Sequence, residues 1–154
     1  MLPEPELSDL YREIILDHYR DPRNHGKLPQ SNVMGEGYNP LCGDEVILQL
    51  LVEGDRVKQA MFEGKGCSIS QASSSMLTEI IQGKSLSQVK QLIERFKGMM
   101  TQGESPAPEL GDLEALEGVR KFPVRVKCAT LAWNVLWDVI NNTERKETKA
   151  PGGS

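Results

Sequence analysis

The sequence has few of the features that mark membrane, secreted or nucleic-acid-binding proteins. Its longest apolar runs fall well short of the roughly 20 residues that a membrane-spanning helix needs. Its acidic first residues lack the basic and apolar regions of a secretory signal. The net charge of -4 disfavours nucleic acid as the main partner, because phosphate binding needs dense basic patches. We therefore expect a cytoplasmic protein that has neither a membrane nor nucleic acid as its partner.

Cysteine is also scarce, with only Cys42, Cys67 and Cys128 in the chain and no Cys-x-x-Cys pair. An odd number of thiols in a reducing compartment argues against a disulfide framework and favours metal binding or sulfur chemistry. The missing Cys-x-x-Cys pair excludes the spacing typical of zinc fingers and ribbons. Spacing alone also fits three small core residues, since free cysteine is among the most buried residue types.

The residues that are present predict one globular domain. A chain of 154 residues with 38% hydrophobic and 26% charged residues can bury a core without disulfides. We expect this single domain to span residues 1–141. The glycines and prolines of 98–111 predict an exposed loop, and the polar residues 142–154 predict a disordered tail.

Hydrophobic spacing predicts helices on both sides of a small sheet. The chain should begin with a helix that ends before Pro22, followed by a weak strand at 34–38. A hairpin is predicted at 46–52 and 56–62, and the apolar first strand of this pair suggests that protein covers both of its faces. Capping-box spacing at 68–71 and 85–88 predicts two helix starts, and a last helix should follow Pro123.

Four residues form a candidate metal site. Cys42 and Asp44 are two apart, and alternate residues of an extended segment point the same way. With Cys67 and Cys128 they offer three thiolates and one carboxylate, a donor set suited to Zn²⁺. Cys67 and Cys128 lie at predicted helix starts, where partial positive charge should lower their pKa values. Three basic residues are placed to offset the negative charge of the site: Lys121, Arg125 and Lys127. We leave His18 and His25 outside it, as surface or helix-face residues.

Several motifs resemble the NifU N-terminal or IscU-like family of iron–sulfur cluster assembly proteins. They are Asn39-Pro40-x-Cys42-Gly43-Asp44 and the segments 11–24, 64–74 and 125–129. The resemblance covers about residues 7–140 and implies an α+β fold, in which helices pack against a small three-stranded antiparallel sheet. It also implies that the metal ligands are Cys42, Asp44, Cys67 and Cys128.

Two departures from the scaffold members of this family indicate the SufU-type branch. Lys127 stands where scaffolds carry a histidine directly before the last cysteine, and residues from about 98 to 121 are similar to an insertion of the SufU-type branch. SufU-like proteins bind zinc and accept sulfur from a cysteine desulfurase. The resemblance therefore implies a sulfurtransferase-like partner of a SufS-like desulfurase rather than a stand-alone enzyme. Cys42 would accept persulfide sulfur and pass it to downstream iron–sulfur assembly proteins or apo-proteins.

Two other functions remain open at this stage. The same four residues suit a scaffold that holds iron or a [2Fe-2S] cluster before its transfer to apo-proteins. A zinc ion with a purely structural role is the third reading.

Overall fold

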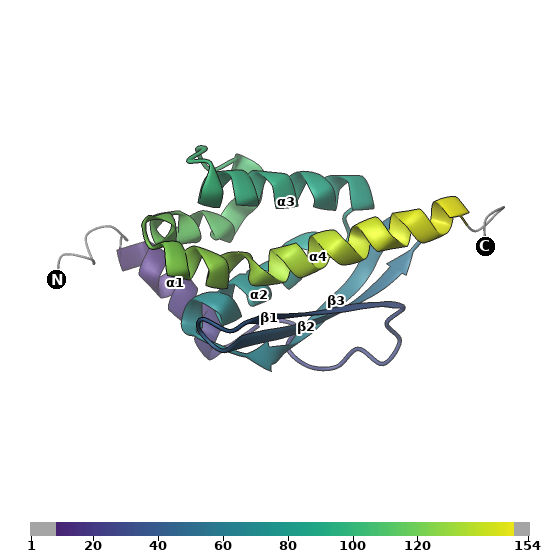
Figure 1. Ribbon diagram of the computed structural model, residues 1–154, viewed down its shortest axis with the longest axis horizontal. Helices are drawn as coiled ribbons and strands as arrows, with labels where there is room; N and C mark the ends of the chain where they lie inside the picture. The colour runs from purple at the N-terminus through teal and green to yellow at the C-terminus, as the bar shows by residue number, and fades with distance from the viewer. Residues whose placement is uncertain (1–8, 150–154) are drawn as a thin grey trace.

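A computed structural model describes the backbone of residues 9–149 and the side chains of residues 10–142. The elements follow one another as α1 (Asp9–Arg20), β1 (Val33–Asn39), β2 (Asp44–Glu53), β3 (Arg56–Lys65), α2 (Ser68–Ile81), α3 (Leu86–Thr101), the 3-10 helix η2 (Pro108–Lys121) and α4 (Pro123–Lys149). The sheet forms one layer, α2 and α4 lie against it, and α3 lies on the far side of α4 (Figure 1). Within residues 9–149, no helix is both long and apolar enough to cross a membrane.

The three strands form one antiparallel sheet in the order β1-β2-β3, which confirms the predicted α+β fold. Its two connections are short. Gly54 allows the tight turn between β2 and β3 because its φ of +62° lies in the left-handed region. The connection between β1 and β2 spans residues 40–43 and contains Cys42.

Buried and more exposed residues alternate along β2. Protein was predicted to cover both faces of this strand, but only one face is fully buried. The buried positions face the helices: Asp44, Val46, Leu48, Leu50 and Val52. The opposite face is crossed by the segment that follows α1. In this segment, Gly26 N donates to Phe62 O at 2.9 Å and Leu28 N donates to the side chain of Gln49 at 2.7 Å. One irregular segment covers less of a sheet than a helix layer does, and β2 therefore keeps half-exposed residues on that side.

The two predicted capping boxes have different outcomes. At α3, Ser85 Oγ accepts from Gln88 N at 3.1 Å and Gln88 Oε1 accepts from Ser85 N at 2.9 Å, so this box is confirmed. The box predicted at 68–71 is wrong. Ser68 is already the first helical residue of α2, and Cys67 takes the N-cap position without a side-chain capping hydrogen bond. The thiol of Cys67 therefore does not cap the N–H groups at the start of α2.

Helices extend into both segments that were predicted to be irregular. α3 continues to Thr101 and η2 begins at Pro108, so the connection between them is shorter than the expected 98–111 loop. α4 continues to Lys149, since Glu, Arg and Lys are good helix formers, whereas a disordered tail was predicted from residue 142. Residues 150–154 lie outside the described part of the chain. The division into one domain and a tail stays a prediction.

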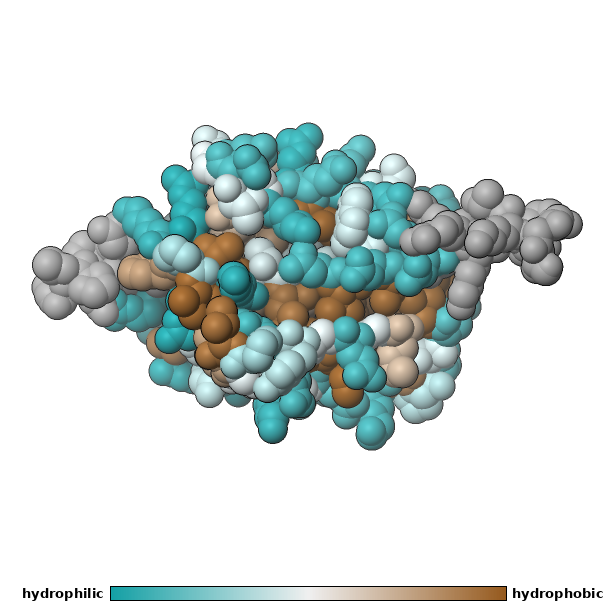
Figure 2. Space-filling model, viewed as in Figure 1, coloured by the Kyte–Doolittle hydropathy of each residue, from teal (hydrophilic) through white to brown (hydrophobic). Residues whose placement is uncertain are grey.

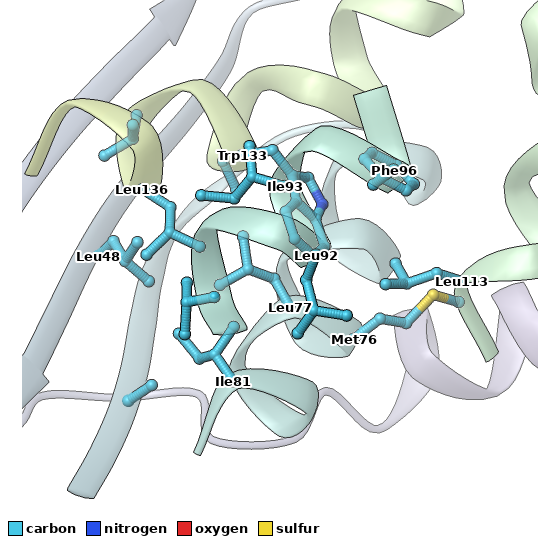
Figure 3. Close-up of a cluster of buried hydrophobic side chains, with 14 of the residues drawn as sticks. Leu48, Met76, Leu77, Ile81, Leu92, Ile93, Phe96, Leu113, Trp133 and Leu136 are labelled. Atoms are coloured by element: carbon cyan, nitrogen blue, oxygen red, sulfur yellow. The ribbon is translucent and has the colours of Figure 1, made fainter. Parts of the chain in front are cut away.

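The core lies between the sheet and the helices, and Figure 3 shows its central side chains. Trp133 of α4 is fully buried and stacks on Phe96 of α3, with ring centroids 4.7 Å apart. Its Nε1 donates to Ser73 Oγ of α2 at 3.0 Å, and Ser73 Oγ donates to Ala129 O at 2.6 Å. These contacts fix α4 against α2. They therefore hold Cys128, which lies in α4, near Cys67, which directly precedes α2.

Candidate metal centre

Cys42 lies in the turn between β1 and β2. Asn39 and Asp44 pair across the two strands and close a four-residue connection. The main-chain N–H groups of Cys42 and Gly43 donate to Asn39 O at 3.3 and 2.8 Å. Gly43 has a φ of +70°, a conformation that glycine adopts without steric cost. The turn holds Cys42 half-buried at the end of the hairpin.

Asp44, the first residue of β2, is completely buried. Its Oδ1 accepts from Cys67 N at 2.9 Å and its Oδ2 accepts from Asn39 Nδ2 at 3.2 Å. The chain passes close to Asp44 at Gly66, where a Cβ atom would lie 2.4 Å from Asp44 Oδ1. Both donors are neutral, and a buried carboxylate is costly unless a cation balances its charge. The environment of Asp44 therefore favours a bound cation.

Cys128 lies in the second turn of α4 and is 1% exposed. Its Sγ is 3.2 Å from Cys42 Sγ. Burial first, and then hydrogen bonds with Asp44, Cys42 and Cys67, raise the pKa of Cys128. The prediction that the helix start lowers this pKa is wrong, because desolvation outweighs the field of the helix. A thiol in this environment keeps its proton unless a metal cation replaces it.

The structure brings all four predicted site residues into one neighbourhood. Ligand atoms of Cys42, Asp44 and Cys128 lie within 4.8 Å of one another. Cys67 is outside that group of three but contacts it, through its main-chain N–H to Asp44 and through a side-chain hydrogen bond with Cys128. Four ligands of one tetrahedral zinc ion with bonds of about 2.3 Å to sulfur would lie about 3.8 Å apart. The donor types of all four residues and the spacing of Cys42, Asp44 and Cys128 therefore fit zinc.

Among the predicted basic residues, Arg125 lies at the thiols. Burial by itself would lower the pKa of Arg125, but the charges of Cys67, Cys128 and Cys42, with a side-chain hydrogen bond to Cys67, raise it. Arg125 and Cys128 are three residues apart and share one face of α4. Arg125 and Lys127 are both exposed, and Lys127 lies on a neighbouring face of α4. Arg125 thus supplies the counter-charge nearest to the site.

The sequence prediction missed the contacts of Asn39. Asn39 Nδ2 lies 3.2 Å from Asp44 Oδ2 and 3.7 Å from Cys128 Sγ. Its place in the Asn-Pro-x-Cys-Gly-Asp motif was the available signal. His18, predicted as a surface or helix-face residue, lies on a buried face of α1, where it is 1% exposed and its Nδ1 lies 2.8 Å from Ser75 Oγ.

Apolar surface adjoins the centre. Leu41 is 61% exposed next to Cys42, and Phe122 and Val124 are exposed at the start of α4. On the face drawn in Figure 2, apolar surface also follows the seam between α4 and the sheet. The half-buried Cys42 thus directly follows an exposed apolar residue, Leu41, in the sequence.

Comparison with known proteins agrees with the fold and the motifs. The model of the NifU-like N terminal domain matches residues 10–150. The chain is 46% identical over 149 residues to the zinc-dependent sulfurtransferase SufU of Bacillus subtilis, covering 96% of each chain. It is 41% identical to the iron-sulfur cluster assembly scaffold protein IscU of Streptococcus pyogenes, over 90% of this chain and 87% of that one. Among solved structures, a putative iron-sulfur cluster assembly scaffold protein for the SUF system from Fervidobacterium islandicum has a TM-score of 0.78 at 35% identity, covering 83% of this chain and 94% of that chain.

Proposed function

The chain belongs to the family of NifU-like N-terminal domains, and from this we propose that it serves iron–sulfur cluster assembly as a zinc-bound sulfur acceptor. In this role it takes persulfide sulfur from a cysteine desulfurase on Cys42 and passes it to downstream assembly proteins or apo-proteins. It acts as a sulfurtransferase-like partner of the desulfurase.

The proposed ligands of zinc are Cys42, Asp44, Cys67 and Cys128. Bound zinc replaces the protons of the thiols and, being redox-inert, protects them without supplying or taking electrons. The buried carboxylate of Asp44, whose two hydrogen-bond donors are both neutral, favours a cation at this place. Arg125 reduces the negative charge that three thiolates and one carboxylate leave around a divalent ion.

One observation supports Cys42 as the acceptor. Asp44 and Cys128 are 0% and 1% exposed and belong to β2 and α4, whereas Cys42 is half-buried in a turn. Moving Asp44 or Cys128 disturbs a strand or a helix that packs in the core. Moving Cys42 disturbs only a short turn. Cys67 is also half-buried, but it is the N-cap of α2 and its main-chain N–H is bonded to the buried Asp44, so moving it disturbs a helix start. Cys42 is therefore the donor that can reach a partner at the lowest cost to the fold.

The sulfur transfer that we propose is a thiol–disulfide exchange. The thiolate of Cys42 attacks the terminal sulfur of the persulfide on the desulfurase. A sulfur–sulfur bond forms at Cys42 as the bond within the donor persulfide breaks, and the donor cysteine leaves as a thiolate. Cys42 then carries the persulfide, and no external oxidant or reductant takes part.

Turnover of a SufS-like cysteine desulfurase tests the acceptor role. We expect the wild-type chain to stimulate turnover and to gain the mass of one sulfur atom on Cys42, and we expect Cys42→Ala to do neither. Lys58→Ala is a suitable control, because Lys58 lies on β3 and pairs with Glu53 near the other end of the hairpin. Normal stimulation by Cys42→Ala would exclude Cys42 as the acceptor.

A scaffold role is the alternative, because several relatives, including the one from Streptococcus pyogenes, are named as scaffolds. Anaerobic addition of iron and sulfide separates the alternatives. A stable [2Fe-2S] cluster without stimulation of the desulfurase supports the scaffold. Stoichiometric zinc with strong stimulation supports sulfur transfer, and zinc with neither result supports a structural ion.

A further inference from the structure

Asn39 makes contacts at the metal centre through its side-chain amide and its main-chain oxygen. It is the last residue of β1 and is 7% exposed. Its Oδ1 accepts from Leu41 N at 3.2 Å, and its main-chain oxygen accepts from the N–H groups of Cys42 and Gly43. Its Nδ2 faces Asp44 Oδ2 at 3.2 Å and Cys128 Sγ at 3.7 Å. One buried amide thus contacts the turn, the strand and the helix that form the site.

These contacts treat the candidate ligands unequally. The amide nitrogen of Asn39 reaches the ligand atoms of Asp44 and Cys128, which are both buried. Cys42 is held by Asn39 through the main chain alone, and its sulfur makes its hydrogen bond with Cys128. The side chain of Asn39 therefore orients two donor atoms and does not hold the sulfur of Cys42. Cys67 is instead held at the start of α2, where its main-chain N–H donates to Asp44.

An amide donor suits this task for an electrostatic reason. N–H groups that point at a carboxylate or a thiolate favour the anionic form of the ligand and fix its orientation. Loss of such an outer contact lowers metal affinity by about 10- to 100-fold in known sites.

We propose that Asn39 is a positioning residue that holds Asp44 and Cys128 on the metal, and that this makes Cys42 the ligand that is released. The inference rests on the proposed function, in which Cys42 accepts sulfur, but the measurements that test it, alkylation rates and zinc affinity, need no desulfurase. Asn39 acts through the ligands and takes no part in the sulfur exchange itself.

The test compares the alkylation of individual cysteines in the zinc-loaded protein. Iodoacetamide should modify Cys42 faster than Cys128 in the wild type, as measured by peptide mass spectrometry. In Asn39→Ala, zinc affinity measured by chelator competition should fall about 10- to 100-fold, as it does when outer contacts of known metal sites are removed. The alkylation rate of Cys128 should rise toward that of Cys42.

Asn32 provides a matched control at the opposite end of the same strand pair. Its Nδ2 donates to Val52 O at 2.7 Å, and its Oδ1 accepts from Val52 N at 2.8 Å. Asn32→Ala removes these bonds from the hairpin away from the cysteines. We expect it to lower stability while leaving zinc affinity and the order of alkylation unchanged. An equal change of order in Asn32→Ala would overturn the proposal.

Asn39→Asp separates positioning from simple turn formation. Aspartate keeps the oxygen that accepts from Leu41 N but lacks the N–H donor that faces Asp44 and Cys128. We expect faster alkylation of Cys128 in this variant with a native circular dichroism spectrum. Wild-type alkylation order and zinc affinity in Asn39→Asp would show that Asn39 only forms the turn. Failure of Cys42→Ala to block sulfur transfer would instead refute the proposed function and leave these measurements standing.

Discussion

Replacing Gly66 with alanine should damage the metal centre without changing any proposed ligand. The new Cβ would lie 2.4 Å from Asp44 Oδ1 and 3.1 Å from Asp44 Cα, far inside normal contact distances. Asp44 is fully buried and paired in β2, so it has little room to retreat. The clash must therefore move the carboxylate or break the 2.9 Å hydrogen bond from Cys67 N.

The expected loss of stability follows from these two effects. Overpacking in a dense region costs about 1–3 kcal/mol, and losing a hydrogen bond to a charged group costs about 1.5–3 kcal/mol. Because relaxation at one site lessens the other cost, we expect Gly66→Ala to lower the free energy of unfolding by about 2–5 kcal/mol. Zinc affinity should fall as well, since Asp44 no longer points at the other donors.

Gly54→Ala is the control for backbone conformation. Gly54 also has a positive φ, but a Cβ there would meet no atom within 4 Å. Its cost should be about 1–2 kcal/mol, the penalty of the left-handed conformation alone. Urea unfolding and chelator competition should be measured for both variants, with and without zinc. Equal destabilisation by both, with unchanged zinc affinity in Gly66→Ala, would refute the argument from close approach.

Three further predictions concern the surroundings of the centre. Trp133→Phe removes the indole donor to Ser73 and should lower the urea-unfolding free energy by about 2 kcal/mol while zinc stoichiometry stays unchanged. The hydrogen bond to Glu114, with smaller contributions from burial and nearby acidic charge, raises the pKa of Tyr11 above 10.0. The contact therefore stabilises the fold below pH 10.0 and is lost as the pH rises through the folded-state pKa, so the difference in urea midpoint between wild type and Tyr11→Phe should shrink above that pH. Arg125→Gln removes the cation beside the thiols and should lower zinc affinity about tenfold in chelator competition.

Each of these has its own contrary result. A stoichiometric loss of zinc in Trp133→Phe would mean that the core reaches the site more directly than the packing suggests. A midpoint difference for Tyr11→Phe that grows at high pH would reverse the sign of the linkage. Arg95→Gln controls for Arg125→Gln, because Arg95 pairs with Glu109 on α3 and η2. Equal zinc affinity in both arginine variants would remove Arg125 from the site.

Local signals in the sequence predicted most of the secondary structure. The turn at Gly54, the capping box at Ser85 and the start of α4 at Pro123 depend on a few neighbouring residues. The errors lie where distant parts of the chain decide. Whether the second face of β2 is covered depends on how the segment after α1 crosses the sheet. The pKa of Cys128 depends on burial, which no helix-end rule contains.

The reason inferred from the sequence for bringing Cys42 and Asp44 together was incomplete. Alternation along a strand was expected to align Cys42 with Asp44, yet Cys42 lies in a turn and only Asp44 lies in β2. The hydrogen bonds of the turn to Asn39 place Cys42, and the packing of α4 brings Cys128 to it. A motif identifies such residues as a set. The contacts that join them form only when the hairpin meets α4.

Lys127 and Arg125 have separate consequences because of the geometry of α4. Neighbouring helix positions are about 100° apart, so the exposed Lys127 points away from the direction of the buried Cys128. Arg125, three positions before Cys128, shares its face and contacts Cys67. A protonated lysine has no lone pair and supplies no metal ligand. Lys127 therefore places a positive charge at the surface, where it faces solvent and any approaching partner. When Cys42 leaves the metal, residue 127 offers no donor atom to take its place.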